Sequence, residues 1–164
     1  MNSIDKINKL SKSDFISIFG NVFEKTEWIA QKSHDSKPYK NFEELFLKMV
    51  EIFENSNKEI HIKILNAHPD LAIEKKLTND SKNEQKNASL NQCTNEEFIE
   101  FKKLNKEYKK KFGFPFIIAV KGRNKNEILD NFRKRIKNDL QEEFYEAKLQ
   151  VKKIALFRLS DVLK

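Results

Sequence analysis

The stretch that decides the fold is TNEEFIEFKKLNKEYKKKF, residues 94–112, which runs directly into GFPFIIAVKG, residues 113–122. In the first part, apolar side chains recur at spacings of three and four residues, which is the period of an α-helix. Thr94 and Glu97 have the spacing of a capping box, in which each side chain accepts a hydrogen bond from the other residue's backbone amide. The sequence therefore predicts a helix that begins after Thr94 and ends near Gly113.

The second part of this stretch interrupts the helical pattern. Two glycines bracket it, Pro115 lies inside it, and its other residues are mainly aromatic or β-branched, which favours extended chain. The backbone N–H and C=O groups of such a segment need hydrogen-bond partners. We therefore expect it to be a buried connector or lone strand, or one wall of a pocket for a compact, planar, polar ligand.

Apolar periodicity and capping pairs predict helices through most of the remaining chain. Further capping pairs are Asn41 with Glu44 and Asn124 with Glu127. Other helices are expected over about 21–31, before His68, and from about 140 to the C-terminus. The predicted fold class is all-α: a single-domain helical bundle over 1–164 with one short extended segment near 114–120.

Composition limits the class of protein. The 164 residues have a formal net charge of +7, but Lys and Arg are scattered among 25 acidic residues, which disfavours a nucleic-acid surface. The single cysteine, Cys93, excludes an internal disulfide and a cysteine-based metal cluster. Apolar runs are too short for a membrane span, and the N-terminus has no signal-peptide core. We expect a cytoplasmic protein without a membrane anchor.

The pentad His68-Pro69-Asp70-Leu71-Ala72 is the first candidate site. Proline disfavours the helical conformation of the residue before it, so His68 is expected where a helix ends. Histidine titrates nearest physiological pH and therefore suits proton transfer. A histidine before a proline is also common at a purely structural helix end, so the motif alone leaves both interpretations open.

A second candidate is Ser81-Lys82-Asn83-Glu84-Gln85. Ser81 and Glu84 have capping-box spacing, so this segment is expected to start a helix. That helix start can also direct backbone N–H groups, the Glu84 carboxylate and the Gln85 amide into a pocket.

Arg158 is the third candidate. It follows Ile154 by four residues, which places its guanidinium on the apolar face of the last helix. A buried arginine is costly unless it is paired. Its partner is either an acid of this protein or a substrate carboxylate bound in bidentate fashion.

In their order and spacing, these motifs resemble those of the OHCU decarboxylases of urate degradation. The resemblance rests on the His68–Ala72 pentad, Ser81 with Glu84-Gln85, the segment 112–118 and Arg158, and it covers the chain from about Phe15 to Leu163. It implies an all-helical, typically homodimeric enzyme that needs no cofactor. Such an enzyme converts 2-oxo-4-hydroxy-4-carboxy-5-ureidoimidazoline (OHCU) to (S)-allantoin and CO₂.

The resemblance also implies roles for the matching positions. His68 is the expected proton donor, acting as general acid/base, and Glu84 and Arg158 are the expected acid and arginine of the active site. The expected substrate-binding residues are Pro69, Ser81, Gln85, Phe116, Ile117, Ile118, Ala119 and Val120. No metal or cofactor is expected, because a C=N bond beside the carboxylated carbon accepts the electron pair that CO₂ leaves behind. The expected partners are OHCU and a second copy of the chain, without nucleic acid or membrane.

Three positions depart from the family pattern: Ile73 and Ser89 replace frequent glycines, and Lys121 replaces the usual arginine. They leave the substrate preference open. One alternative function is a basic helical module that binds nucleic acid or a protein without catalysis, and steep salt dependence would reveal nucleic-acid binding. A second alternative is a hydrolase or isomerase that acts on a related cyclic ureide with the same histidine and glutamate.

Overall fold

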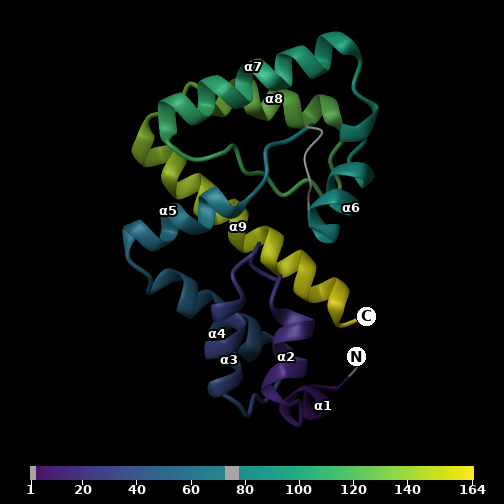
Figure 1. The fold of residues 1–164 in the computed structure, drawn as a ribbon, viewed down its shortest axis with the longest axis vertical. Coiled ribbons are helices and arrows are strands. Elements are labelled where there is room, and N and C mark those ends of the chain that lie inside the picture. The colour runs from purple at the N-terminus through teal and green to yellow at the C-terminus, as the bar shows by residue number, and fades with distance from the viewer. Residues whose placement is uncertain (1–2, 73–77) are drawn as a thin grey trace. The chain divides into compact units, whose positions relative to one another are not determined.

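The computed structural model describes residues 3–72 and 78–164, which form helices joined by short connections (Figure 1). No strand occurs in these two ranges, and the all-α prediction is confirmed. Ile73, one of the departures from the family pattern, lies outside the described residues. The chain divides into two compact units, Met1–Ala67 with Lys152–Lys164, and His68–Val151, which are described separately below. The single domain over 1–164 stays a prediction.

The first unit is a set of helices around aromatic side chains. Its helices are α1 (Ile4–Asn8), α2 (Lys12–Phe19), α3 (Glu27–Asp35), α4 (Phe42–Glu54), α5 (Lys58–Ala67) and the part of α9 (Leu140–Val162) that begins at Lys152. Helix α3 packs against both α2 and α4. The rings of Phe23 and Phe53 stack with centroids 5.3 Å apart, and the His61 ring lies 5.0 Å from Phe53. These contacts bury the apolar faces that the periodicity predicted.

Helix α3 begins later than the sequence predicted. The expected start was Asn21, whereas the first helical residue is Glu27. The backbone of Lys25 has φ = 51°, in the left-handed region, which a right-handed helix cannot contain without strain. The Asn21 side chain accepts the Lys25 N–H at 3.0 Å and stabilises this turn. The prediction of helix over residues 21–26 is therefore wrong.

The second unit contains the stretch with which the sequence analysis began. Its elements are α6 (Asn79–Asn87), a short 3₁₀ helix η1 (Leu90–Gln92), α7 (Asn95–Phe112), α8 (Lys125–Arg135) and α9 as far as Val151. Helices α7 and α8 lie side by side (Figure 1). The capping boxes predicted at Thr94 and Asn124 are both present and confirmed.

Helix α6 begins one turn before the predicted start. Thr78 is its N-cap, and the Thr78 hydroxyl oxygen accepts the Ser81 N–H at 3.2 Å. Ser81 is therefore the third helical residue, so the expectation that it begins the helix is wrong. Because the cap lies three residues earlier, Glu84 and Gln85 belong to the middle of α6.

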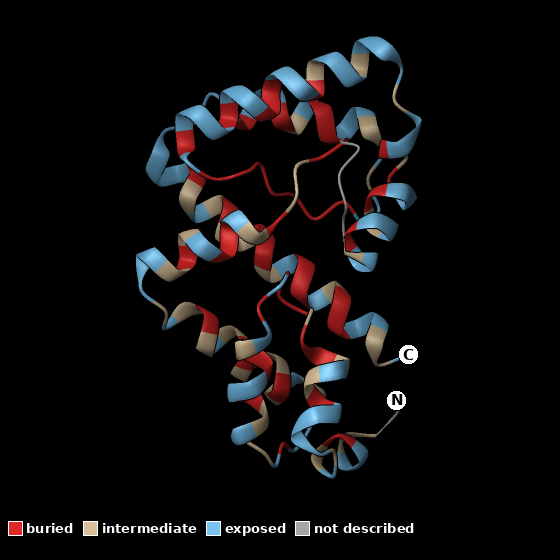
Figure 2. Ribbon diagram, viewed as in Figure 1, coloured by how far each residue is buried: buried red, intermediate tan, exposed pale blue. Residues whose placement is uncertain are grey.

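The segment after α7 is non-helical and buried. Gly113 has φ = 79°, a left-handed conformation that ends α7. The chain then runs as an open thread beneath α7 and α8 in Figure 1, and it is buried throughout 114–120 in Figure 2. The Phe116 ring stacks on Phe132 of α8 at 3.9 Å, and Tyr108 of α7 contacts the same ring edge-on at 5.5 Å. Of the expected arrangements, the structure shows a buried connector and no strand over 114–120, and the role of a pocket wall stays a prediction.

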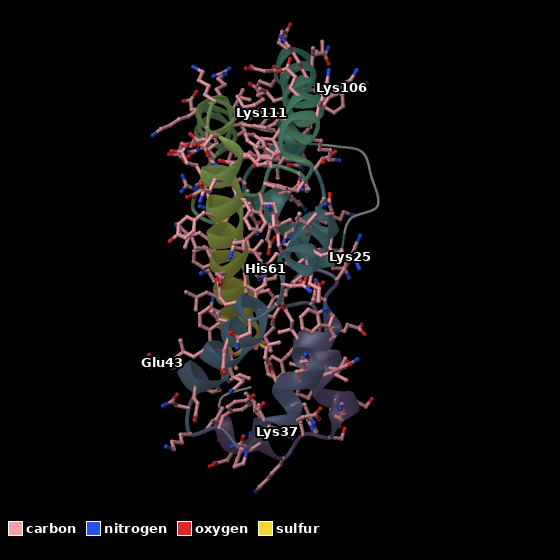
Figure 3. All side chains as sticks on the ribbon, turned by 90° about the vertical axis from the view of Figure 1, so that its left-hand side faces the viewer. Lys25, Lys37, Glu43, His61, Lys106 and Lys111 are labelled. Atoms are coloured by element: carbon pink, nitrogen blue, oxygen red, sulfur yellow. The ribbon has the colours of Figure 1, made fainter. Side chains whose placement is uncertain are left out.

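Lys111 joins α7 to the end of α8. Its ammonium donates hydrogen bonds to the carbonyl oxygens of Ile136 and Asn138, both at 2.7 Å. Figure 3 labels Lys111 and Lys106, two exposed residues of α7. A cation that satisfies carbonyl groups at a helix C-terminus stabilises that end through the helix dipole.

Candidate active site

His68 lies where its proline predicted. Helix α5 ends at Ala67, and His68 is the next residue, with only 8% of its surface exposed. The prediction that His68 stands at a helix end is confirmed. Pro69 is half-buried, and the backbone of Ala72 has φ = 53°, so the pentad ends in a sharp turn.

The Gln85 side chain holds this turn from α6. Its Nε2 donates to the Asp70 carbonyl oxygen at 3.2 Å, and its Oε1 accepts the Ala72 N–H at 3.1 Å. One amide therefore bridges the backbone on both sides of Leu71, and Gln85 is itself buried. The structure brings two predicted motifs together, and the Gln85 amide bonds the pentad directly.

Helix α7 holds the same turn from another direction. The Asn105 amide donates to the Leu71 carbonyl oxygen at 3.0 Å, and the Lys109 ammonium lies 2.7 Å from the Asp70 carboxylate. Neither residue was predicted from the sequence. The available signal was the position of Asn105 four residues after Phe101, on the apolar face of α7, where a polar residue needs a buried partner.

Ser81 and Glu84 share a face of α6 with Gln85. Ser81 lies three residues before Glu84 and four before Gln85, which are neighbour spacings on a helix surface. Ser81 is buried and Glu84 is half-buried. Of these three side chains, Gln85 bonds the pentad directly.

Two side chains bond the backbone of the segment expected to form the pocket wall. Arg135 Nη1 of α8 donates to the Ile117 carbonyl oxygen at 2.7 Å. The Gln150 Oε1 of α9 accepts the Ala119 N–H at 2.9 Å. The five residues named as candidates for substrate binding are at most 6% exposed: Phe116, Ile117, Ile118, Ala119 and Val120.

Arg135, which bonds this segment, also forms a buried ion pair with Glu143. The Glu143 carboxylate, fully buried, accepts hydrogen bonds from Arg135 Nε at 2.7 Å, the Tyr108 hydroxyl at 2.6 Å and the Asn138 amide at 3.0 Å. Burial, together with the adjacent Glu143 charge, raises the pKa of Tyr108 well above its ordinary value, so Tyr108 remains a neutral donor. This network was not predicted from the sequence, although Arg135 follows Phe132 by three residues on the apolar face of α8.

Arg158 belongs to the first unit. Its Nη2 lies 2.6 Å from the Glu24 carboxylate, and its Nη1 donates to the Asn21 carbonyl oxygen at 2.9 Å. Both charged groups are almost completely buried. Of the two partners left open for Arg158, the structure shows the acid of the protein itself; a role toward a substrate carboxylate stays a prediction.

No helix in the described ranges is long and apolar enough to cross a membrane. Within the same residues, no cluster of three histidine, cysteine, aspartate or glutamate side chains is arranged to hold a metal ion.

Comparison with known proteins gives one consistent result. The family model for OHCU decarboxylase matches residues 8–160. The chain is 40% identical over its full length to a uric acid degradation bifunctional protein of Bacillus sp. (strain TB-90), and it spans only 33% of that relative. It is 31% identical to the 2-oxo-4-hydroxy-4-carboxy-5-ureidoimidazoline decarboxylase of Haloferax volcanii, covering 97% of this chain and 95% of that one.

A solved structure agrees. The crystal structure of an (S)-allantoin synthase superposes with a TM-score of 0.82 at 25% identity, covering all of this chain and 54% of that one. The family model and the near-complete coverage of the Haloferax relative span both compact units. The chain belongs to the OHCU decarboxylase family.

Proposed function

We propose that this chain catalyses the decarboxylation of OHCU to (S)-allantoin and CO₂ in urate degradation, without a cofactor. The observation that carries the proposal is the buried His68 at the end of α5, followed by a turn that Gln85 and Asn105 hold by hydrogen bonds. The names of the relatives support the reaction, since one is a decarboxylase of OHCU and a structural neighbour is an (S)-allantoin synthase.

The reaction needs orientation and one proton. The bond between the ring carbon and its carboxylate breaks, its electron pair forms a C=C bond to the neighbouring ring carbon, and the π pair of that carbon's C=N bond moves to the nitrogen, which takes up a proton. The ring hydroxyl then loses its proton and becomes a carbonyl, while one face of the neighbouring carbon receives a proton, which sets the stereochemistry. His68 supplies this proton as general acid/base, a contribution of about 10²–10⁴-fold in rate.

The other candidate residues orient the substrate. Glu84, half-buried and directly before Gln85 in α6, accepts hydrogen bonds from ureido or ring N–H groups through its carboxylate. Pro69, Ser81 and the buried segment Phe116–Val120 also bind the substrate. Arg158 binds the substrate carboxylate through its planar, multi-donor guanidinium, while Glu24 keeps that charge compensated in the protein interior.

A coupled assay tests the proposal. Urate oxidase and hydroxyisourate hydrolase generate OHCU in place, and its loss of absorbance and the optical activity of the allantoin are followed. The parent should accelerate both signals, and His68→Asn should reduce the rate by about 10²–10⁴-fold. The matched control is His34→Asn, since His34 lies in α3 of the first unit and pairs with Asp35 on the surface.

A parent protein that leaves OHCU decay at its spontaneous rate would sink the proposal. If that protein bound nucleic acid with steep salt dependence, the non-catalytic alternative would replace it. If His68→Asn kept near-parental turnover while the parent was active, the histidine would not be the proton donor.

We also propose that the chain forms a homodimer, which the resemblance to the family supports, and that it works in the cytoplasm. Light scattering of the purified protein should give about twice the 19.5 kDa mass of one chain. A single species at the monomer mass across micromolar concentrations would contradict the dimer.

A further inference from the structure

The buried segment Phe116–Val120 has hydrogen bonds to side chains at alternate residues. The Ile117 carbonyl accepts from Arg135, and the Ala119 amide donates to Gln150. The Arg135 and Gln150 side chains therefore bond the backbone at two points, one on each side of Ile118.

Both side chains are themselves fixed by further contacts. Arg135 pairs with the fully buried Glu143, and its guanidinium lies 4.4 Å from the centre of the Phe116 ring. The Gln150 Nε2 donates to the Glu146 carboxylate at 2.7 Å, which orients its Oε1 toward the segment. A side chain that is held by a second polar contact has fewer orientations available, so it positions the backbone it contacts.

We propose that Arg135 and Gln150 are positioning residues of the active site. They fix the segment on both sides of Ile118, and the N–H and C=O of Ile118 bond the substrate as a paired donor and acceptor. Such a pair complements the N–H and C=O of a cyclic ureide. This inference rests on the proposed function, because it assumes that the segment Phe116–Val120 binds the substrate.

A role of Arg135 and Gln150 in folding alone predicts a different result. If Arg135 and Gln150 served folding alone, a folded variant that lacked the Ala119 contact would keep its affinity for ligand and its turnover. Gln150 is the better residue to change, because Arg135→Met would leave Glu143 as an uncompensated buried charge and impair folding.

The experiment uses three variants of the full chain. Gln150→Met keeps the side-chain length but removes the acceptor for the Ala119 N–H. The double variant Glu146→Gln with Gln150→Glu conserves net charge and exchanges donor and acceptor, so residue 150 keeps an acceptor oxygen and residue 146 supplies the amide. Gln141→Met is the control, since Gln141 is an exposed residue of the same helix.

Three measurements are made on each variant: kcat and KM for OHCU, the Kd of (S)-allantoin, and hydrogen exchange of the amides in 116–120. Gln150→Met should lower kcat/KM by about tenfold, chiefly through KM, weaken allantoin binding by a similar factor, and speed exchange at Ala119. The double variant Glu146→Gln with Gln150→Glu should restore kcat/KM to within about threefold of the parent value. The control Gln141→Met should have the parent's kcat/KM.

The outcomes separate this inference from the proposed function. Parental kcat/KM and Kd in a folded Gln150→Met, beside an active parent, overturn the positioning role. Unchanged exchange at Ala119 overturns the claim that Gln150 holds the segment. A parent that neither consumes OHCU nor binds allantoin overturns the proposed function and, with it, the substrate-binding role of Ile118. The exchange measurement then still decides whether Gln150 holds the backbone at Ala119.

Discussion

The buried pair Arg135–Glu143 gives the sharpest test of how the second unit is stabilised. Glu143→Gln keeps the shape of the side chain but removes its charge. The change leaves the Arg135 guanidinium, 7% exposed, without a counter-charge, and it also weakens the acceptor of the Tyr108 hydroxyl. An amide at this position also adds N–H donors to a site that needs acceptors.

The size of the effect follows from burial. Breaking a buried ion pair by removing one partner costs about 3–5 kcal/mol, because the remaining charge is uncompensated. At about 2–4 °C per kcal/mol for a protein of this size, the melting temperature should fall by about 6–20 °C. Tyr108→Phe removes one hydrogen bond to a charged group and should cost less, about 1.5–3 kcal/mol.

An exposed ion pair serves as the matched control, because its arginine lies in α8 like Arg135. Arg133 of α8 forms a two-pronged pair with Glu100 of α7 at 2.6 and 2.7 Å, but the two side chains are 48% and 35% exposed. Glu100→Gln should therefore cost about 1 kcal/mol or less. Urea unfolding followed by circular dichroism gives the free energies of unfolding. If Glu143→Gln and Glu100→Gln destabilised the protein equally, the argument from burial would be refuted.

Two further predictions concern the first unit. Burial raises the pKa of Tyr39 to about 12, so the neutral side chain stabilises the fold below about pH 10. This contribution to stability is lost as the pH rises toward 12. Unfolding titrations should show a shallower alkaline decline in the free energy of unfolding for Tyr39→Phe than for the parent or for the exposed control Tyr145→Phe. Arg158→Lys should lower kcat/KM for OHCU by about tenfold, because lysine cannot reproduce the planar fork. Unchanged kinetics with a lowered melting temperature would make Arg158 a structural partner of Glu24 alone.

Much of the helical architecture was predictable because its signals are local. The capping boxes at Thr94 and Asn124 need only residues three positions apart, and both formed as expected. The two wrong helix starts also have local causes. Thr78 caps α6 ahead of Ser81, and the left-handed Lys25 delays α3, because neighbouring residues within one turn compete to end or begin a helix.

The candidate site was only partly predictable. The position of His68 follows from Pro69, since a proline restricts the residue directly before it. Asn105 lies 34 residues from the carbonyl it bonds, so no local pattern identifies its partner. The one available sign was a polar residue on an apolar helix face, which shows that a partner is needed without naming it.

By itself, the sequence determined the all-α class, the helix end at His68, the break after Gly113 and the burial of Arg158, because each depends on residues within a turn or two of the chain. Tertiary structure alone decided which groups these residues bond. Gln85 bonds the backbone of the pentad, Arg135 and Gln150 bond the backbone of the buried segment at Ile117 and Ala119, and Glu24 pairs with Arg158. Buried polar groups must find partners wherever the fold brings them, and a linear pattern does not contain those distances.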